Sequence, residues 1–385
     1  MAVRTVRTTL VGTVTVTAAA ALTATVLTSP AAADSRTGDH QRTQQAMDAA
    51  VADGVPGVAG QAVDGHGTWK GTSGVGNLKT GKKRSAHDRF RAASITKTFV
   101  ATVLLQLQGE GELDLDDTVE EWLPGVVHGN GHDGSKITVR RLLNHTSGIY
   151  DYTVDPEFAR KTFGKDFLKH RYDTHRPDEL VGIAMTHKPL FEPGEKWSYS
   201  NTNYVLAGMI IEKVTGKAYG DEIRQRVIKP LGLRATSVPG TEHTMPRPSS
   251  RAYSKLSDKP VGKTYDVTEF NPSLAGAAGE MISDSGDLNR FYRALFGGRL
   301  LPAEQLKEMK ETIPIEGVQN VTYGLGLIKS ELSCGKEVWG HAGGIHGSNS
   351  WAVTTADGGH ALAFNLNGDW SGDSEAVIEA EYCGK

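Results

Sequence analysis

The sequence predicts an α/β fold of the α+β type, in which an antiparallel sheet is flanked by terminal helices and carries a mostly helical lobe. Three observations predict it: strand-like segments lie near both ends of the 385-residue chain, helical segments fill its middle, and strands and helices do not alternate regularly. A parallel sheet would need that alternation, so the strands of both ends are expected to join one antiparallel sheet. We expect a sheet lobe of about residues 46–95 and 250–385 and a helical lobe of about residues 96–249.

The first 33 residues are predicted to be a secretory signal peptide. Arg4 and Arg7 form a basic start, residues 8–28 carry no charge, and residues 31–33 supply the small side chains of a cleavage site. The uncharged run is long enough to span a membrane, but it consists mostly of Ala and Thr, which favours cleavage near Ala33 over a stable membrane anchor. We therefore expect a secreted, extracellular protein with one domain over residues 34–385.

The N-terminal part of the chain is predicted to form a β-hairpin followed by a long helix. Behind a polar leader of residues 34–45, residues 57–63 and 68–75 flank a Gly-containing turn and predict a β-hairpin. Residues 95–108 repeat apolar side chains at helical spacing and end at a Gly-rich stretch, which predicts a helix.

The remaining elements are predicted in the same way. A mostly helical region extends to about residue 188, and an apolar helix over residues 204–214 stops at Gly216, a residue typical of helix C-termini. The last third predicts helices over residues 286–295, 302–311 and 374–382, strands over residues 321–328 and 338–340, and a hairpin of residues 351–355 and 360–365.

Charge and cysteine usage limit the partners. A formal net charge of −3 lacks the basic footprint of a nucleic-acid-binding protein, and we expect a monomer without such a partner. In an exported protein the isolated pair Cys334 and Cys383 predicts a disulfide bond. Two thiols without histidines at matching spacing make a weak metal site, so no metal and no cofactor are expected.

A possible nucleophile stands at the start of the helix over residues 95–108. In Ser94-Ile95-Thr96-Lys97, positions i and i+3 share one helix face, so the serine hydroxyl and the lysine amine can form a hydrogen bond. A desolvated lysine has a lowered pKa and can accept the serine proton. Backbone N–H groups at the helix start can help to hold an oxyanion.

Tyr199-Ser200-Asn201 is a second candidate, after a Pro-Gly turn and before the apolar helix. In an extended segment residues i and i+2 point the same way, so the phenol and the carboxamide would face one cleft. A phenolate stabilised by a nearby ammonium group can act as general base, and the amide can orient a substrate carbonyl. The alternative is structural, with the tyrosine packed between lobes and Asn201 capping the next helix.

The third motif, Gly340-His341-Ala342-Gly343-Gly344, precedes the final hairpin. The order Ser-x-x-Lys, Tyr-x-Asn, then a short strand with a basic residue and glycines resembles the class C β-lactamase and penicillin-binding serine hydrolase family. The likeness is closest to its secreted serine D-alanyl-D-alanine carboxypeptidase/transpeptidase group, and it covers nearly all of residues 34–385. The resemblance implies a β-lactamase/transpeptidase-like fold and a serine hydrolase without metal or cofactor.

The resemblance also implies a role for each residue. Ser94 would attack a carbonyl and form an acyl-enzyme, while Lys97 and Tyr199 relay the proton. Asn201 would position the substrate amide, and His341 would tune the tyrosine electrostatically.

Gly343 and Gly344 are expected to contact the substrate, with the backbone N–H groups of Ser94 and Gly344 forming the oxyanion hole. The implied activity is D-alanyl-D-alanine carboxypeptidase-like hydrolysis of D-amino-acid-containing peptides, such as peptidoglycan stem peptides. β-Lactams are expected to acylate the same serine.

Two positions depart from the family pattern. Ala342 stands where carboxypeptidase relatives have a hydroxyl residue, and Ile328 where they have an arginine. Both family residues help to bind a terminal carboxylate, and charge-assisted bonds are worth about 1.5 to 3 kcal/mol each. An esterase, a D-aminopeptidase or an amidase of the same fold therefore remains an alternative, as does a non-catalytic penicillin- or wall-peptide-binding protein.

Three further side chains lie near the motifs in sequence. His346 either contacts substrate or, as the favoured interpretation, is a solvated loop histidine. Tyr150 and Tyr152 either line the cleft or pack between the lobes.

Overall fold

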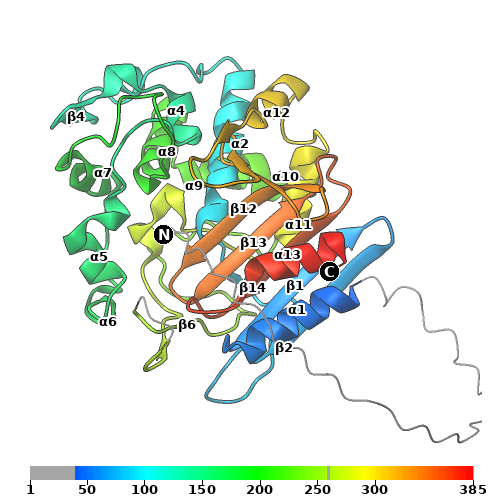
Figure 1. The fold of residues 1–385 in the computed structure, drawn as a ribbon. Coiled ribbons are helices and arrows are strands. Elements are labelled where there is room, and N and C mark those ends of the chain that lie inside the picture. Colours follow the sequence, from blue (N-terminus) through cyan, green and yellow to red (C-terminus); the bar gives the residue numbers. More distant parts are fainter. Residues whose placement is uncertain (1–39, 258–260, 385) are drawn as a thin grey trace, which may run out of the picture.

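The structure, a computed structural model, describes residues 40–257 and 261–384, and within them the largest feature is an eight-stranded antiparallel sheet (Figure 1). Its strand order is β2-β1-β14-β13-β12-β11-β10-β9. The bounds are β1 (Gly57–Asp64), β2 (Gly67–Gly74), β9 (Ile313–Pro314), β10 (Val321–Tyr323), β11 (Ile328–Glu331), β12 (Glu337–Ile345), β13 (Ser348–Thr354) and β14 (Ala361–Leu366). Val58 of β1 lies opposite Leu366 of β14, so both ends of the chain build one sheet, as predicted.

Helices cover both faces of this sheet. The terminal helices α1 (Gln41–Ala52) and α13 (Ser374–Cys383) lie side by side on one face, while α11 (Ser285–Phe296) packs against β13, β14 and β1. The predicted disulfide between Cys334 and Cys383 is confirmed, with 5.7 Å between the Cα atoms. It links the end of α13 to the connection between β11 and β12.

The expected leader over residues 34–45 is partly wrong, because α1 begins at Gln41. Thr43, Met47 and Ala50 are buried at helical spacing, but these three small or apolar side chains stand among polar ones. That pattern gives only a faint periodic signal. Residues 1–33, the expected signal peptide, lie outside the described residues.

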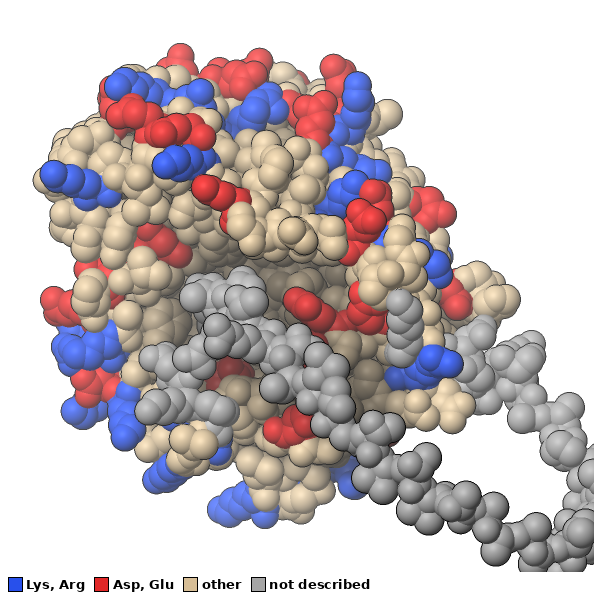
Figure 2. Space-filling model, viewed as in Figure 1, with Lys and Arg blue, Asp and Glu red and all other residues tan. Residues whose placement is uncertain are grey.

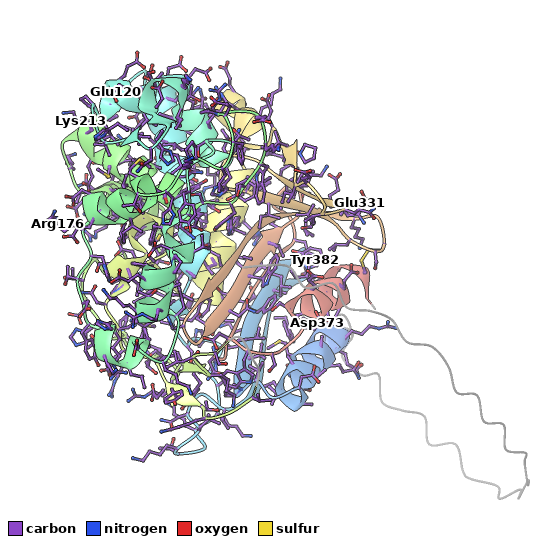
Figure 3. The ribbon with its side chains drawn as sticks, turned by 60° about the vertical axis from the view of Figure 1, so that its left-hand side comes forward. Glu120, Arg176, Lys213, Glu331, Asp373 and Tyr382 are labelled. Atoms are coloured by element: carbon purple, nitrogen blue, oxygen red, sulfur yellow. A yellow bond between two sulfur atoms is a disulfide. The ribbon has the colours of Figure 1, made fainter. Side chains whose placement is uncertain are left out.

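Between the strands, the chain forms a largely helical half (Figure 1). Figure 3 labels Glu120, Arg176 and Lys213 on this half, whereas Glu331, Asp373 and Tyr382 lie on the sheet side. Its helices are α2 (Thr96–Gly109), α3 (Val119–Trp122), α4 (Val139–Leu143), α5 (Pro156–Thr162), α6 (Phe167–His170), α7 (Pro177–Met185), α8 (Asn201–Thr215), α9 (Tyr219–Ile223) and α10 (Lys229–Leu231). The short helix α12 (Ala303–Met309) packs against α2.

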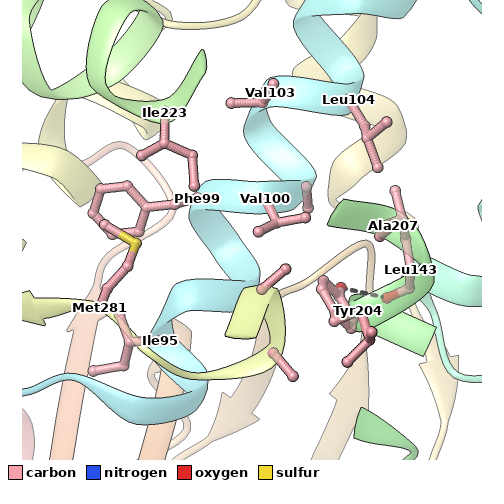
Figure 4. Close-up of a cluster of buried hydrophobic side chains, with 14 of the residues drawn as sticks. Ile95, Phe99, Val100, Val103, Leu104, Leu143, Tyr204, Ala207, Ile223 and Met281 are labelled. Carbon is pink, nitrogen blue, oxygen red and sulfur yellow. Dashed lines mark hydrogen bonds between the residues drawn. The ribbon is translucent and has the colours of Figure 1, made fainter. Parts of the chain in front are cut away.

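Helix α2 forms the centre of the main hydrophobic core. Eleven of its fourteen residues are buried, and its side chains pack against α8 and against the segment around Met281 (Figure 4). Tyr204 of α8 is buried there, and its hydroxyl is satisfied because it donates to the carbonyl of Leu143 at 2.8 Å. This core fixes the first turn of α2, where Ser94 and Lys97 lie.

Two predicted strand boundaries differ in the structure. The strand expected over residues 321–328 is β10 alone, followed by a turn over residues 324–327, and β11 begins only at Ile328. Strand β12 continues to Ile345 instead of ending at Gly340. Glycines at 340, 343 and 344 mask the strand signal of β12. Pairing with β13 nevertheless keeps it extended, with His341 opposite Ala352. No helix within residues 40–257 and 261–384 has the length and apolar character needed to cross a bilayer.

Candidate active site

Ser94 lies in a single 3-10 turn, η1 (Ala93–Ile95), that leads directly into α2. The Nζ atom of Lys97, one turn further along, donates to Ser94 Oγ at 3.1 Å. Ala93 has a φ of 50°, a left-handed conformation that is costly for a residue with a Cβ and is typical of positions where a functional group must be presented. The structure therefore brings together the serine and lysine that their spacing predicted.

Lys97 is completely buried, and its ammonium group has a full set of acceptors. Besides Ser94 it donates to Asn201 Oδ1 at 2.8 Å and to the carbonyl of Ala278 at 2.7 Å. Burial lowers the pKa of Lys97 to about 7, and the negative charge of Asp151 opposes this shift. Near neutral pH a large fraction of Lys97 is consequently uncharged and able to accept a proton from Ser94.

Asn201 is the first residue of α8, and its carboxamide is held from both ends. Its oxygen accepts from Lys97, while Nδ2 donates to Asp151 Oδ2 at 3.0 Å and to Thr153 Oγ1 at 3.3 Å. These contacts fix which end of the amide faces the lysine. Asp151 was not anticipated from the sequence, since a lone aspartate in a loop carries no motif. It is 8% exposed, and no ion pair to it occurs among the described residues.

Tyr199 is half-buried and faces Lys97, whose Nζ lies 4.8 Å from the centre of the phenol ring. Burial raises the pKa of the Tyr199 phenol above its ordinary value, while a hydrogen bond with Ser94 acts in the opposite direction. The tyrosine is therefore a neutral phenol in the free protein, able to donate a proton, and not the phenolate expected from the sequence. Ser94, Lys97, Tyr199 and Asn201 form one cluster.

His341 belongs to a second, buried chain of polar contacts. Its Nε2 lies 2.9 Å from the hydroxyl of Tyr323, which in turn lies 3.2 Å from Nε2 of His145. Burial, together with the nearby charge of Lys97, lowers the pKa of His341 to about 3. The imidazole is thus neutral near pH 7, and its hydrogen bonds go to Tyr323 and the carbonyl of Ala342 instead of Tyr199.

His145 connects this second chain to Tyr199. The two rings are 4.3 Å apart, and His145 Nδ1 accepts from the backbone N–H of Ser200 at 3.2 Å. Burial lowers the pKa of His145 well below its ordinary value, so this ring is neutral as well. Neither His145 nor Tyr323 is marked by a sequence motif, and only the fold brings them beside His341.

Strand β12 passes close to the nucleophile because it lacks side chains there. A Cβ atom on Gly343 would lie 2.1 Å from the carbonyl oxygen of Ala92, a severe clash. Ser350 of β13 donates to the carbonyls of Ala92 and Gly343, both at 3.3 Å, and so ties the strand to the start of η1. Gly344 is exposed next to this contact, in a position consistent with an oxyanion site.

The two positions that depart from the family pattern lie beside the site without offering a cation to it. Ile328 of β11 is paired with Gly340 of β12. The neighbouring Lys329 forms an ion pair with Glu337, with 2.5 Å between the charged atoms. Ala342 has no hydrogen-bonding side chain, so the groups that would hold a terminal carboxylate in relatives are missing here.

The structure also places the three remaining candidates. Tyr152 is 1% exposed and its hydroxyl donates to the carbonyl of Leu274 at 2.8 Å, so it is a packing residue. Tyr150 is partly exposed and stacked on His187 at 3.8 Å. The expectation that His346 is a solvated loop histidine is wrong, because the ring is 4% exposed and stacked on Phe167.

The face in Figure 2 is hollowed near its centre, in the area where β12 passes in Figure 1, and acidic side chains gather around the hollow. Within the part of the chain that the structure describes, no group of three or more His, Cys, Asp or Glu side chains has the arrangement of a metal site. The chemistry of the cluster is that of acyl transfer to a serine, assisted by a lysine and a phenol.

Comparison with known proteins agrees with this chemistry. The beta-lactamase family model matches residues 40–382. A D-stereospecific amidohydrolase from Streptomyces sp. has 64% sequence identity and a TM-score of 0.87, with 90% of this chain and 99% of that chain covered. A D-amino acid amidase from Ochrobactrum anthropi SV3, solved with D-phenylalanine, has 32% identity and a TM-score of 0.77 over the same shares.

Among curated proteins, penicillin-binding protein 4* from Bacillus subtilis (strain 168) is 28% identical over 302 residues, 75% of this chain. The match spans only 63% of that relative's length. The family match and these structures confirm the fold class and the resemblance predicted from the three motifs. This chain belongs to the beta-lactamase family and is a serine hydrolase.

Proposed function

We propose that the protein is a D-stereospecific amidohydrolase, which hydrolyses amides of D-amino acids through an acyl-Ser94 intermediate. The observation that carries the proposal is the buried Lys97, hydrogen-bonded to both Ser94 and Asn201, in a chain 64% identical to a D-stereospecific amidohydrolase. A lysine desolvated beside a serine activates the nucleophile, so the cluster is built for acyl transfer.

Acylation begins when neutral Lys97 takes the proton of Ser94 and Oγ attacks the amide carbon. The carbonyl oxygen becomes an oxyanion, stabilised by the backbone N–H groups of Ser94 and Gly344. As the C–N bond breaks, the Tyr199 hydroxyl gives its proton to the leaving nitrogen. Lys97 then returns a proton to Tyr199, so the amine departs carrying the proton that Ser94 lost.

Deacylation repeats these transfers with water in place of the amine. Water attacks the ester carbon and passes its proton to Tyr199, which protonates Lys97. Lys97 then protonates Ser94 Oγ as the ester bond breaks and the D-amino acid is released. The neutral His145 and His341, linked through Tyr323, support the tyrosine side of the site without placing a second positive charge beside Lys97.

Electrostatics favour an amide of a free amino acid over a D-alanyl-D-alanine peptide. Ala342 and Ile328 offer nothing to a substrate carboxylate, and Lys329 is already paired with Glu337. Asp151, nearly buried beside Asn201 and without an ion-pair partner among the described residues, favours a substrate cation such as an α-ammonium group. A carboxypeptidase-like peptidase remains the second candidate on family grounds.

We also propose that the protein is exported and that β-lactams acylate it, on the grounds of its sequence and its family. Export with cleavage near Ala33 agrees with the disulfide, which forms in oxidising compartments. We expect a monomer, acylation by β-lactams and activity on reactive esters. A non-catalytic binder would have no use for a serine beside a lysine whose pKa is about 7.

The test is a substrate panel with a label for the nucleophile. The wild type is expected to hydrolyse D-alanine amide and D-phenylalanine amide far faster than their L forms, and faster than a D-Ala-D-Ala peptide. A fluorophosphonate should label the wild type and spare Ser94→Ala. Preference for the free-carboxylate peptide would overturn the choice of substrate, and equal labelling of Ser94→Ala would overturn the mechanism.

A further inference from the structure

One edge of β12 is free where it passes the nucleophile. Strand β11 pairs with β12 only from Glu337 to Gly340, while β13 pairs with it as far as Ile345. Among the described residues, no strand occupies the other edge from His341 to Ile345, while the side-chain face of β12 at Gly343 meets the carbonyl of Ala92, just before η1. A substrate backbone can therefore add itself along this edge.

The free edge ends at a ring stack that joins the two halves of the protein, which we call the aromatic clasp and define as His346, Phe163 and Phe167. His346, the first residue after β12, is stacked on Phe167 with ring centres 4.0 Å apart and on Phe163 at 5.3 Å. The interplanar angles are 12° and 7°. Phe270 packs edge-on against His346 at 5.5 Å, and His346 is only 4% exposed.

The aromatic clasp connects the segment that carries Ser94 to the segment that carries Asn201, on the side of the catalytic cluster where β12 ends. Phe163 follows α5, and α5 follows the short turn η3 (Tyr152–Val154). That turn is fixed to the start of α8, because Asn201 donates to Thr153 Oγ1 and the backbone N–H of Tyr152 donates to Thr202 Oγ1. The connected segments are therefore β12 beside Ser94, the aromatic clasp, α5, and η3, which contacts Asn201.

The position of Tyr199, which protonates the leaving nitrogen, determines which part of a substrate faces the aromatic clasp. The leaving nitrogen must lie near Tyr199, which is on the His341 side of the free edge because Tyr323 lies between the two: its ring centre is 6.4 Å from that of Tyr199, and its hydroxyl is 2.9 Å from His341 Nε2. The acyl part then points the other way, past Gly344 toward His346. These two residues are about 7 Å apart along the strand, since an extended residue advances about 3.3 Å. This distance accommodates one aminoacyl residue, and a second would meet the rings.

We propose that the aromatic clasp limits the acyl part of the substrate to a single residue with a free amino group. The inference rests on the proposed function and deepens it. The enzyme would release one D-amino acid at a time from an amide or peptide amine, and would act neither on internal bonds nor on donors extended at the amino end. His346 contributes its flat ring to the clasp, since it lies nearly parallel to both Phe163 and Phe167.

The experiment compares D-alanine p-nitroanilide with D-alanyl-D-alanine p-nitroanilide, with mass spectrometry to identify the acid released with p-nitroaniline. The wild type should favour the one-residue donor by about tenfold or more in kcat/KM. Phe163 is 37% exposed, so Phe163→Ala should fold, and it should reduce this ratio about tenfold by raising the rate on the longer donor. His346→Ala should act in the same direction, whereas His346→Phe, which keeps a flat ring, should retain the wild-type ratio.

Leu168→Ala is the matched control, because Leu168 directly follows the clasp residue Phe167 in α6, is 40% exposed and is not part of the stack. It should leave both rates as in the wild type. Equal turnover of the two donors by the wild type would refute the length limit and leave the proposed function standing. An unchanged ratio in both Phe163→Ala and His346→Ala would also refute it. No turnover of the one-residue donor would refute the proposed function itself.

Discussion

Replacing Asp151 with asparagine should move the acid limb of the pH profile to lower pH. Lys97 must be uncharged to accept the Ser94 proton, so kcat/KM should rise with pH through the lysine pKa of about 7. The Asp151 carboxylate stabilises the protonated lysine, and removing its charge lowers the lysine pKa. Asp151→Asn keeps the size of the side chain and a carbonyl oxygen to accept a hydrogen bond.

The size of the shift follows from the contacts that join the two charges. Lys97 Nζ lies 2.8 Å from Asn201 Oδ1, and Asn201 Nδ2 lies 3.0 Å from Asp151 Oδ2. A carboxamide spans about 2.3 Å, so the charges are at most about 8 Å apart. At an effective dielectric constant of about 20 their attraction is about 2 kcal/mol, equivalent to about 1.5 pH units. We expect a measured shift of about 1 pH unit.

The assay is kcat/KM on a short p-nitrophenyl ester between about pH 5 and pH 9, because an uncharged ester adds no titration of its own in this range. Asp155→Asn is the control: Asp155 caps α5 and pairs with His187, and asparagine can also cap a helix. Its acid limb should stay in place. If the acid limb of the kcat/KM profile of Asp151→Asn does not move, or moves to higher pH, Lys97 is not the base.

Three further predictions concern the contact between β12 and the start of η1, the disulfide bond, and stability in acid. Gly343→Ala should abolish most activity by pushing β12 from η1, since its Cβ would lie 2.1 Å from the Ala92 carbonyl; kinetics with a thermal melt separate this from unfolding. Breaking the bond by Cys334→Ser should cost about 4 kcal/mol in the chain-entropy model, measured by denaturant unfolding against the disulfide-bonded wild type. Burial raises the pKa of Glu381, but hydrogen bonds from two histidines and a threonine lower it more, so the net shift is downward. Its stabilisation should be complete above the ordinary value of 4.5 and lost as pH falls below it, so the Tm gap between wild type and Glu381→Gln should close in acid.

The sequence predicted the parts of the site that local geometry determines. Ser94 and Lys97 are one helical turn apart, and Tyr199 and Asn201 are two residues apart at a helix start, so each pair is set by nearby backbone. Asp151 reaches the site from a turn 50 residues before Asn201, and no local pattern reports such a contact. Polar residues placed by tertiary packing alone are invisible to spacing arguments.

The fold predictions that were correct likewise depend on local sequence, and those that were wrong depend on tertiary packing. The hairpin of β1 and β2 is marked by a Gly-containing turn between its strands, and it was predicted nearly to the residue. The continuation of β12 was missed because its glycines have no strand propensity of their own, and pairing with β13 holds them extended. His346 looked like a loop residue for the same reason, since its burial depends on two phenylalanines from another part of the chain.

The two polar chains that meet at Tyr199 explain how the site keeps its charges apart. Asp151, Asn201 and Lys97 form a chain in which a fixed negative charge keeps the lysine pKa from falling further than burial alone would take it. His145, Tyr323 and His341 form a chain whose members are buried and uncharged. A protonated imidazole in the second chain would repel Lys97 and hold it uncharged throughout the cycle. Burying both histidines therefore lets Lys97 accept and return a proton, which the acyl transfer requires in each half of the reaction.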